Sequence, residues 1–234
     1  GATAATFTLS NVAIADNGAQ LRVVVTNLIG TAVSDVATLS VTTDTPPMPT
    51  ILTPFVETKY AAGNTISFSA AATDIEDGTL GGAAMTWQVD FHHDTHSHPF
   101  MAPLTGVAAG SFVIPTIGET SANVWYRITL SVVDSAGLKT TISRDVHPVT
   151  SNFTVLTNFG GGQILVDGQP HSAPLTTTGV VNIERTLTAP ATQLTPSGEL
   201  ATFVRWLDGE THNTRTISTP ANDKAYIAVY ANAS

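Results

Sequence analysis

The chain has 234 residues, of which 42% are apolar and only 12% are charged, with a formal net charge of −9 and no cysteine. The acidic balance argues against nucleic acid or an anionic membrane as a partner, because both bind clusters of Lys and Arg. No run of about 18 apolar residues is present, so we expect no membrane insertion. Without disulfides, stability must come from packing, with bound ions as a further contribution.

Residues 1–44 contain three strand-like stretches, at 5–12, 20–27 and 33–41, separated by turns. The pattern resembles the last three strands of a bacterial immunoglobulin-like domain. Three strands cannot close a sandwich, so residues such as Phe7 and Val25 would stay exposed to water. We therefore expect a partial domain that is interrupted at Gly1 and packs on a neighbouring module or on another copy of the chain, giving self-association.

Residues 45–50 carry three prolines, Pro46, Pro47 and Pro49. Proline keeps the backbone extended and removes amide donors. We expect a linker and a domain boundary here.

Residues 51–148 read as short strands with no helical stretch, which predicts a complete β-sandwich. Three segments, 72–80, 87–91 and 126–137, resemble a PKD-type immunoglobulin-like module, in which the tryptophan strand and the tyrosine strand lie side by side. Together with the stretches 92–100 and 123–127, these segments make roughly the last 180 residues similar to modules that follow the propeller in secreted bacterial sugar dehydrogenases of the glucose/sorbosone type. This resemblance implies a secreted, extracellular accessory region of a bacterial carbohydrate-active protein, with carbohydrate or neighbouring modules as partners.

Residues 149–234 contain about six further strand-like stretches, one of them spanning 179–187. Turn signals at Asp167-Gly168 and Asp208-Gly209 predict hairpins. The pattern resembles small terminal β modules of secreted bacterial proteins, whose role is attachment or spacing. The expected fold is therefore all-β: tandem immunoglobulin-like (PKD-like) sandwich modules, the first one incomplete.

The strongest concentration of chemistry follows the predicted strand at 87–91, whose apolar and polar residues alternate with Trp87 on the buried side. A loop or strand end there carries imidazole and carboxylate groups that suit zinc or copper: His92, His93, His96, His98 and Asp94. If the chain bends at Asp94, either His92 or His93 would meet the other two imidazoles. The alternative is a solvated polar loop without a metal.

A second group of carboxylates offers hard oxygen ligands for calcium: Asp74, Glu76, Asp77 and Asp134. Ordinary turn chemistry is the alternative, because Asp and Gly favour such turns without an ion.

A surface formed by Trp125, Arg127 and Phe100 would let an indole ring stack on a sugar. We favour the alternative that Trp125 covers a neighbouring module.

Catalysis has little support, since neither a nucleophilic triad nor a nucleotide loop nor a facing carboxylate pair is visible. The favoured function is a non-catalytic accessory, spacing or attachment region with a structural metal at the histidines. A carbohydrate-binding module is the first alternative, and a copper or zinc enzyme at the histidines is the second.

Overall fold

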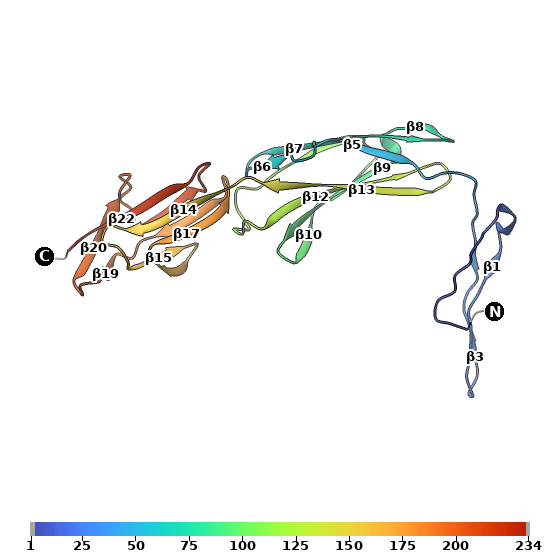
Figure 1. Cartoon of the computed structure of the whole chain (residues 1–234), viewed down its shortest axis with the longest axis horizontal. Helices are drawn as coiled ribbons and strands as arrows, with labels where there is room; N and C mark the ends of the chain where they lie inside the picture. The colour runs from blue at the N-terminus through green and yellow to red at the C-terminus, as the bar shows by residue number, and fades with distance from the viewer. Residues whose placement is uncertain (1–2, 233–234) are drawn as a thin grey trace.

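The computed structural model describes residues 3–232, which are almost entirely β-structure, with two short 3-10 segments at Ile14–Asp16 and Gly82–Ala84. This confirms the predicted all-β class. Figure 1 shows an elongated molecule with an N-terminal hairpin segment at one end and the C-terminal sheets at the other. None of the helical segments in the described part of the chain is long and apolar enough to cross a membrane.

The first hydrophobic core lies between two sheets. One has the strand order β10 (His96–Thr105), β9 (Met85–His93), β12 (Val124–Val133), β13 (Lys139–Pro148), β6 (Lys59–Tyr60). The other has the order β11 (Ala109–Val113), β7 (Thr65–Asp74), β5 (Met48–Thr53), with β8 (Gly78–Leu80) paired to β7. Residues of both sheets belong to one buried cluster, so the sheets pack face to face.

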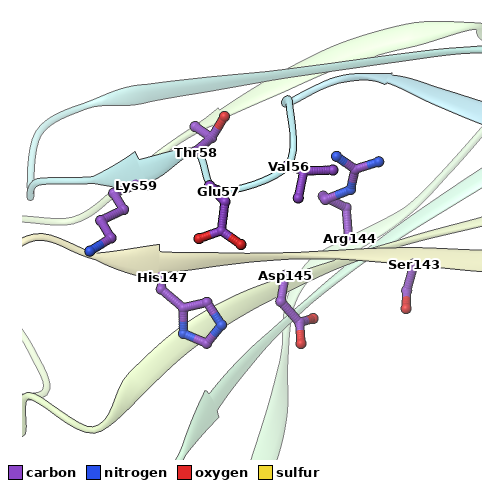
Figure 2. Close-up of a pocket in the computed structure, with 8 residues that line it drawn as sticks. All are labelled: Val56, Glu57, Thr58, Lys59, Ser143, Arg144, Asp145 and His147. Atoms are coloured by element: carbon purple, nitrogen blue, oxygen red, sulfur yellow. The ribbon is translucent and has the colours of Figure 1, made fainter.

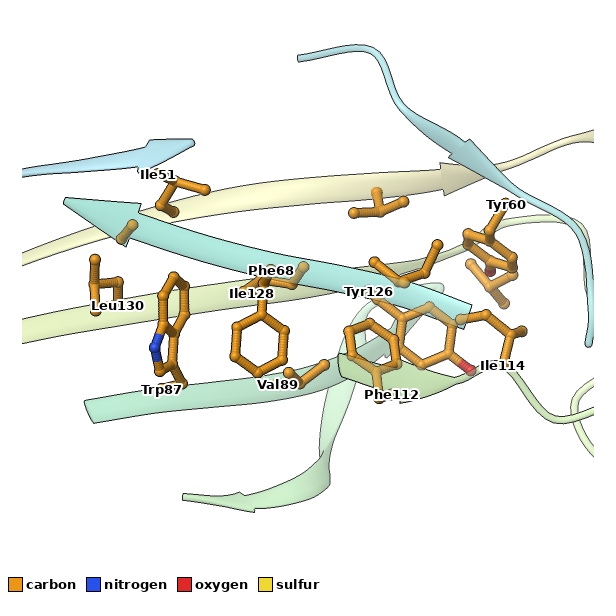
Figure 3. Packing of buried hydrophobic residues seen from close by; sticks show 14 of the residues in the cluster. Ile51, Tyr60, Phe68, Trp87, Val89, Phe112, Ile114, Tyr126, Ile128 and Leu130 are labelled. Atoms are coloured by element: carbon orange, nitrogen blue, oxygen red, sulfur yellow. The ribbon is translucent and has the colours of Figure 1, made fainter. Parts of the chain in front are cut away.

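Strict alternation along β12 explains this packing, because every second residue from Val124 to Val132 is buried. Trp87 on β9 is fully buried, as predicted, with its ring centroid 4.6 Å from that of Phe68 on β7 (Figure 3). The indole Nε1 donates a hydrogen bond of 3.0 Å to the Val107 carbonyl, which satisfies its one polar group. The tryptophan therefore fixes β9 rigidly on the core.

The second core also lies between two sheets. The first has the strand order β17 (Leu175–Val180), β14 (Thr150–Thr157), β22 (Lys224–Asn232), β20 (Leu200–Trp206), β19 (Thr192–Leu194). The second has the order β16 (Gln169–Ser172), β15 (Gln163–Val166), β18 (Glu184–Thr188), β21 (Thr214–Ser218). Residues of both sheets belong to one buried cluster.

The prediction of one continuous strand over 179–187 is wrong, because the chain turns between β17 and β18. Asn182 has φ 68°, a left-handed conformation that asparagine tolerates. Val180 and Ile183, on either side of it, pack against the first core. The turn thus provides contact between the two cores.

The N-terminal segment forms an irregular hairpin in which β1 (Gln20–Leu21) pairs with β4 (Ala37–Thr38), and β2 (Val24–Thr26) with β3 (Thr31–Val33). The predicted strand at 5–12 is wrong, because within residues 3–232 this stretch pairs with no other strand. Phe7 is 56% exposed and Ile29 is 96% exposed. The apolar side chains are therefore left in solvent, as expected for too few strands.

The Pro-rich stretch 45–50 is only partly a linker, since Met48–Thr53 forms β5 and pairs with β7. β5 is the last strand of its sheet. An edge strand tolerates proline because one side of its backbone needs no hydrogen-bonding partner. Pro49 therefore sits within a strand, opposite Ala72.

Candidate metal centre

The histidines lie on a hairpin, at the end of one strand and the start of the next; of the two predicted settings, a loop or a strand end, the structure has the strand end. β9 continues to His93, Asp94 and Thr95 form the turn, and β10 starts at His96. Asp94 has φ 48°, which aspartate tolerates in a two-residue hairpin turn. Its amide donates to the Asn123 carbonyl, and its carboxylate accepts from the Asn123 side chain at 3.2 Å. The turn is thus anchored to the chain entering β12.

This hairpin brings three imidazoles onto one face. His93 and His96 are opposite each other in the strand register, and His98 lies two residues further along β10, on the same side as His96. The ring centroids of His93 and His96 are 3.8 Å apart, and those of His93 and His98 are 5.0 Å apart. One nitrogen from each of the three rings lies within 4.8 Å of the others.

The spacing of these nitrogens fits a small metal ion. The Nε2 atoms of His93 and His98 are 2.9 Å apart. Nitrogens bound tetrahedrally to zinc at about 2.0–2.1 Å are about 3.3 Å apart. The His93 and His98 nitrogens would move apart by a few tenths of an ångström, and the His96 nitrogen, which lies within 4.8 Å of both, would settle at a similar distance.

A carboxylate lies behind His93, where a metal site commonly has one. The Oε2 atom of Glu119 is 3.7 Å from Nδ1 of His93, on the side of the ring opposite Nε2. At this distance the two atoms are not hydrogen-bonded. An outer carboxylate that closed this gap would orient the metal-binding imidazole and raise its basicity. Glu119 was not predicted, because it lies in the loop between β11 and β12, and nothing local in the sequence connects it to the hairpin.

The other two predicted ligands lie elsewhere. Successive residues of a strand point to opposite faces, so His92 is turned away from His93. Its ring stacks on Trp125 with the centroids 4.8 Å apart. The Asp94 carboxylate accepts a hydrogen bond from the Asn123 side chain instead. The structure therefore narrows the predicted set of five residues to His93, His96 and His98.

The predicted surface of Trp125, Arg127 and Phe100 does not form as one face. Phe100 lies on the core side, with its ring centroid 4.8 Å from that of Tyr126. Alternation along β10 places it there, because it follows His98 by two residues and His98 pairs with Phe91, which packs on the core. Trp125 and Arg127 do share the outer face. The indole, however, lies between the imidazoles of His92 and His147, whose centroids are 4.8 Å and 6.0 Å away.

Arg127 is bound by Asp145 of β13 through two hydrogen bonds of 2.7 Å each. The pKa of Asp145 is lowered below its usual value, mainly by these hydrogen bonds from the guanidinium and to a smaller extent by its positive charge.

An open cavity of about 460 Å³ lies where β13 meets the segment before β6. Figure 2 shows its lining: Val56, Glu57, Thr58, Lys59, Ser143, Arg144, Asp145 and His147. A second, apolar cavity of about 170 Å³ lies between Tyr60, Phe100 and the turn at Ile183. Neither cavity is lined by His93, His96 or His98.

The carboxylates that cluster near Asp74 also differ from the predicted set of calcium ligands. Asp74 and Glu76 lie together, but the third member of their group is Asp44, with one oxygen from each within 4.8 Å of the others. Asp77 is occupied, because both its oxygens accept hydrogen bonds from Ser135. Asp44 was not predicted as a ligand, because it lies 30 residues before Asp74, next to the expected linker.

No protein-family model matches the chain, and neither a curated protein nor a solved structure matches it significantly.

Proposed function

We propose that the chain is a non-catalytic spacing or attachment region of a secreted bacterial multidomain protein associated with carbohydrate, and that it binds one structural zinc or copper ion. His93, His96 and His98 are the proposed ligands, and Glu119 is the proposed outer carboxylate that orients His93.

The convergence of three imidazoles on one hairpin carries this proposal. His93 is half-buried, whereas His96 and His98 are exposed at the rim of the core. A metal there would join the end of β9 to the start of β10. Neutral imidazoles are suitable ligands for zinc and copper.

The accessory role is supported by the arrangement around the hairpin. An enzyme would need a concave cleft at the metal to bind its substrate. None of the three imidazoles lines either cavity, although Phe91 and Glu119, which lie next to His93, line the smaller one. At about 170 Å³ that cavity is smaller than the roughly 300–1,000 Å³ of a typical ligand pocket. His96 and His98 instead face open solvent on a strand at the edge of the sheet.

We also propose that the units around the two cores are immunoglobulin-like modules, the first of PKD type. The strand of Trp87 pairs directly with the strand of Tyr126 in one sheet, as the resemblance implies. The second sheet covers these residues on the core side.

Thermal unfolding of metal-free protein with added zinc or copper tests the proposal. We expect a higher melting temperature that a chelator reverses, because a ligand that binds only the folded state stabilises it. The loaded protein should show no hydrolase or oxidase turnover. A melting temperature unaffected by either metal, or sustained turnover, would contradict the proposal.

The alternative of carbohydrate binding has one observation in its favour. The 460 Å³ cavity offers the polar groups of Glu57, Lys59 and Asp145, and it adjoins the indole of Trp125 through His147. Sugars are recognised by such polar groups next to an aromatic ring. Polysaccharide pull-down with a Trp125→Ala variant as the control would distinguish this role from a spacing role.

A further inference from the structure

We infer that the structure contains a calcium site at the other end of the first core, built by Asp44, Asp74, Glu76 and Asp134, and that the ion holds the N-terminal segment against the sheets. This site uses none of the histidines and does not depend on the proposed function.

Three carboxylates, of Asp44, Asp74 and Glu76, have oxygens within 4.8 Å of one another, and a fourth, that of Asp134, belongs to the same end of the sheets. Asp74 ends β7, Glu76 follows in the turn to β8, and Asp134 follows β12. Asp44 comes from the segment before β5, and its oxygen lies within 4.8 Å of those of Asp74 and Glu76. None of the ion pairs found among the described residues involves any of the four.

Two of these carboxylates are buried and incompletely satisfied. Asp74 is 5% exposed and Asp134 is 8% exposed. In each, Oδ1 accepts backbone hydrogen bonds, but Oδ2 is buried without a partner. A buried carboxylate oxygen without a hydrogen bond is costly, so these two atoms indicate a missing ligand.

The negative charges of these carboxylates repel one another, which shows in the pKa of Asp44. Partial desolvation, followed by hydrogen bonding to Glu76 and the charges of Asp134, Glu76 and Asp74, raises the pKa of Asp44. Asp134 precedes Ser135, whose amide and hydroxyl donate hydrogen bonds to Asp77, so Asp134 lies beside the β7–β8 turn. A divalent cation would relieve this repulsion and give the unpartnered oxygens a ligand.

The ligand chemistry favours calcium. All the donors are hard carboxylate oxygens, without the nitrogen or sulfur that zinc and copper prefer. Several carboxylates from flexible turns suit the six to eight ligands of calcium at about 2.3–2.6 Å. Magnesium instead keeps most of its waters and needs a near-ideal octahedron.

The surrounding hydrogen bonds show what the ion would stabilise. Thr45, next to Asp44, donates to Glu76 from its hydroxyl at 2.8 Å and from its amide at 3.2 Å. Asp77 accepts from Ser135 and so joins the β7–β8 turn to the β12–β13 turn. The ion would add a ligand from the incoming segment to this network and fix the direction in which the N-terminal hairpin leaves the sheets.

Calorimetric titration of the whole, metal-free chain with calcium tests the inference. We expect one site, with a dissociation constant on the order of 10⁻⁴ to 10⁻³ M or tighter, and weaker binding of magnesium. Asp44→Asn should weaken calcium binding by at least about ten-fold, and because Asp44 lies outside the core this variant should still fold. Asp223→Asn, an exposed carboxylate elsewhere, is the matched control and should bind calcium as the parent does.

Limited proteolysis gives the second readout. Calcium should protect the chain around Thr42–Thr45 in the parent but not in Asp44→Asn, and His98→Ala should retain the protection. No calcium binding up to about 10 mM, ten-fold above the weakest expected dissociation constant, would overturn the inference, as would unchanged binding in Asp44→Asn. Failure of zinc to bind the histidines would leave it unaffected.

Discussion

His93 and His96 face each other across a two-residue turn, with their ring centroids 3.8 Å apart. Because β-strand side chains alternate, this pairing decides which histidines join the cluster and which do not. His98 is included, and His92 is placed on the opposite face against Trp125.

This alternation predicts opposite results for two neighbouring histidine variants. His98→Ala removes one proposed ligand and should weaken zinc binding by at least about ten-fold. His92→Ala, the matched control, should leave zinc affinity unchanged, because its ring points away. Competition with a chromogenic chelator measures both. Equal losses in the two variants would show that the metal is held differently.

Trp87 is expected to dominate the stability of the first core. Trp87→Ala removes a fully buried indole that contacts Phe68, and should lower the free energy of unfolding by about 3–5 kcal/mol. Trp125→Ala, on the half-buried outer face, should cost markedly less. Denaturant unfolding measures the difference. A larger loss of unfolding free energy in Trp125→Ala than in Trp87→Ala would contradict the prediction that the face of Trp87 carries the main packing.

The second core contains a buried charge that depends on one partner. Arg185 has only 5% of its side chain exposed, lies over the Phe153 ring, and contacts Asp167 at 2.6 Å. Asp167→Asn would leave the guanidinium uncompensated, at a cost of about 3 kcal/mol.

The control for this prediction is Asp208→Asn, which breaks a more exposed pair with Arg215 and should cost less than about 1 kcal/mol. Chemical denaturation of the two variants gives the comparison. Similar, small losses in both would show that burial of Arg185 contributes little.

Acid should weaken the pair between Arg127 and Asp145. The pKa of Asp145 is lowered in the folded chain, first by hydrogen bonds from Arg127, so the pair stabilises the fold above the unfolded pKa of 3.8. This contribution is lost as the pH falls through the lower folded value. It is modest, because Arg127 is 41% exposed.

Comparing the parent with Arg127→Met measures this effect. The difference in melting temperature should be present at neutral pH and should shrink once the pH falls below about 3.8. A difference that stays constant into strong acid would contradict the assignment of the lowered pKa to this pair.

The sequence predicted the parts of the fold that local patterning determines. Alternation identified β9 and β12 and placed Trp87 inside, and the crowding of imidazoles marked the hairpin. The sequence left open whether His92 or His93 would join the cluster, because that depends on the residue at which the strand turns. A pairing across a turn is a register property, and one residue of shift reverses every face.

Errors arose where tertiary contacts overrode local signals. The prolines at 46–49 indicated a linker, yet an edge strand accommodates Pro49 beside β7. Phe100 was expected outside, but the pairing of β10 with β9 places it on the core side. Glu119 and Asp44 reach their sites from distant loops, and such long-range contacts have no local signature in the sequence.

His93, His96 and His98 together should bind one metal ion. Elemental analysis after loading with zinc and extensive dialysis measures this, with the His93→Ala, His96→Ala, His98→Ala triple variant in parallel. We predict one zinc ion per chain in the parent and none in the triple variant. A parent that retains no zinc, or a triple variant that retains as much as the parent, would contradict the claim.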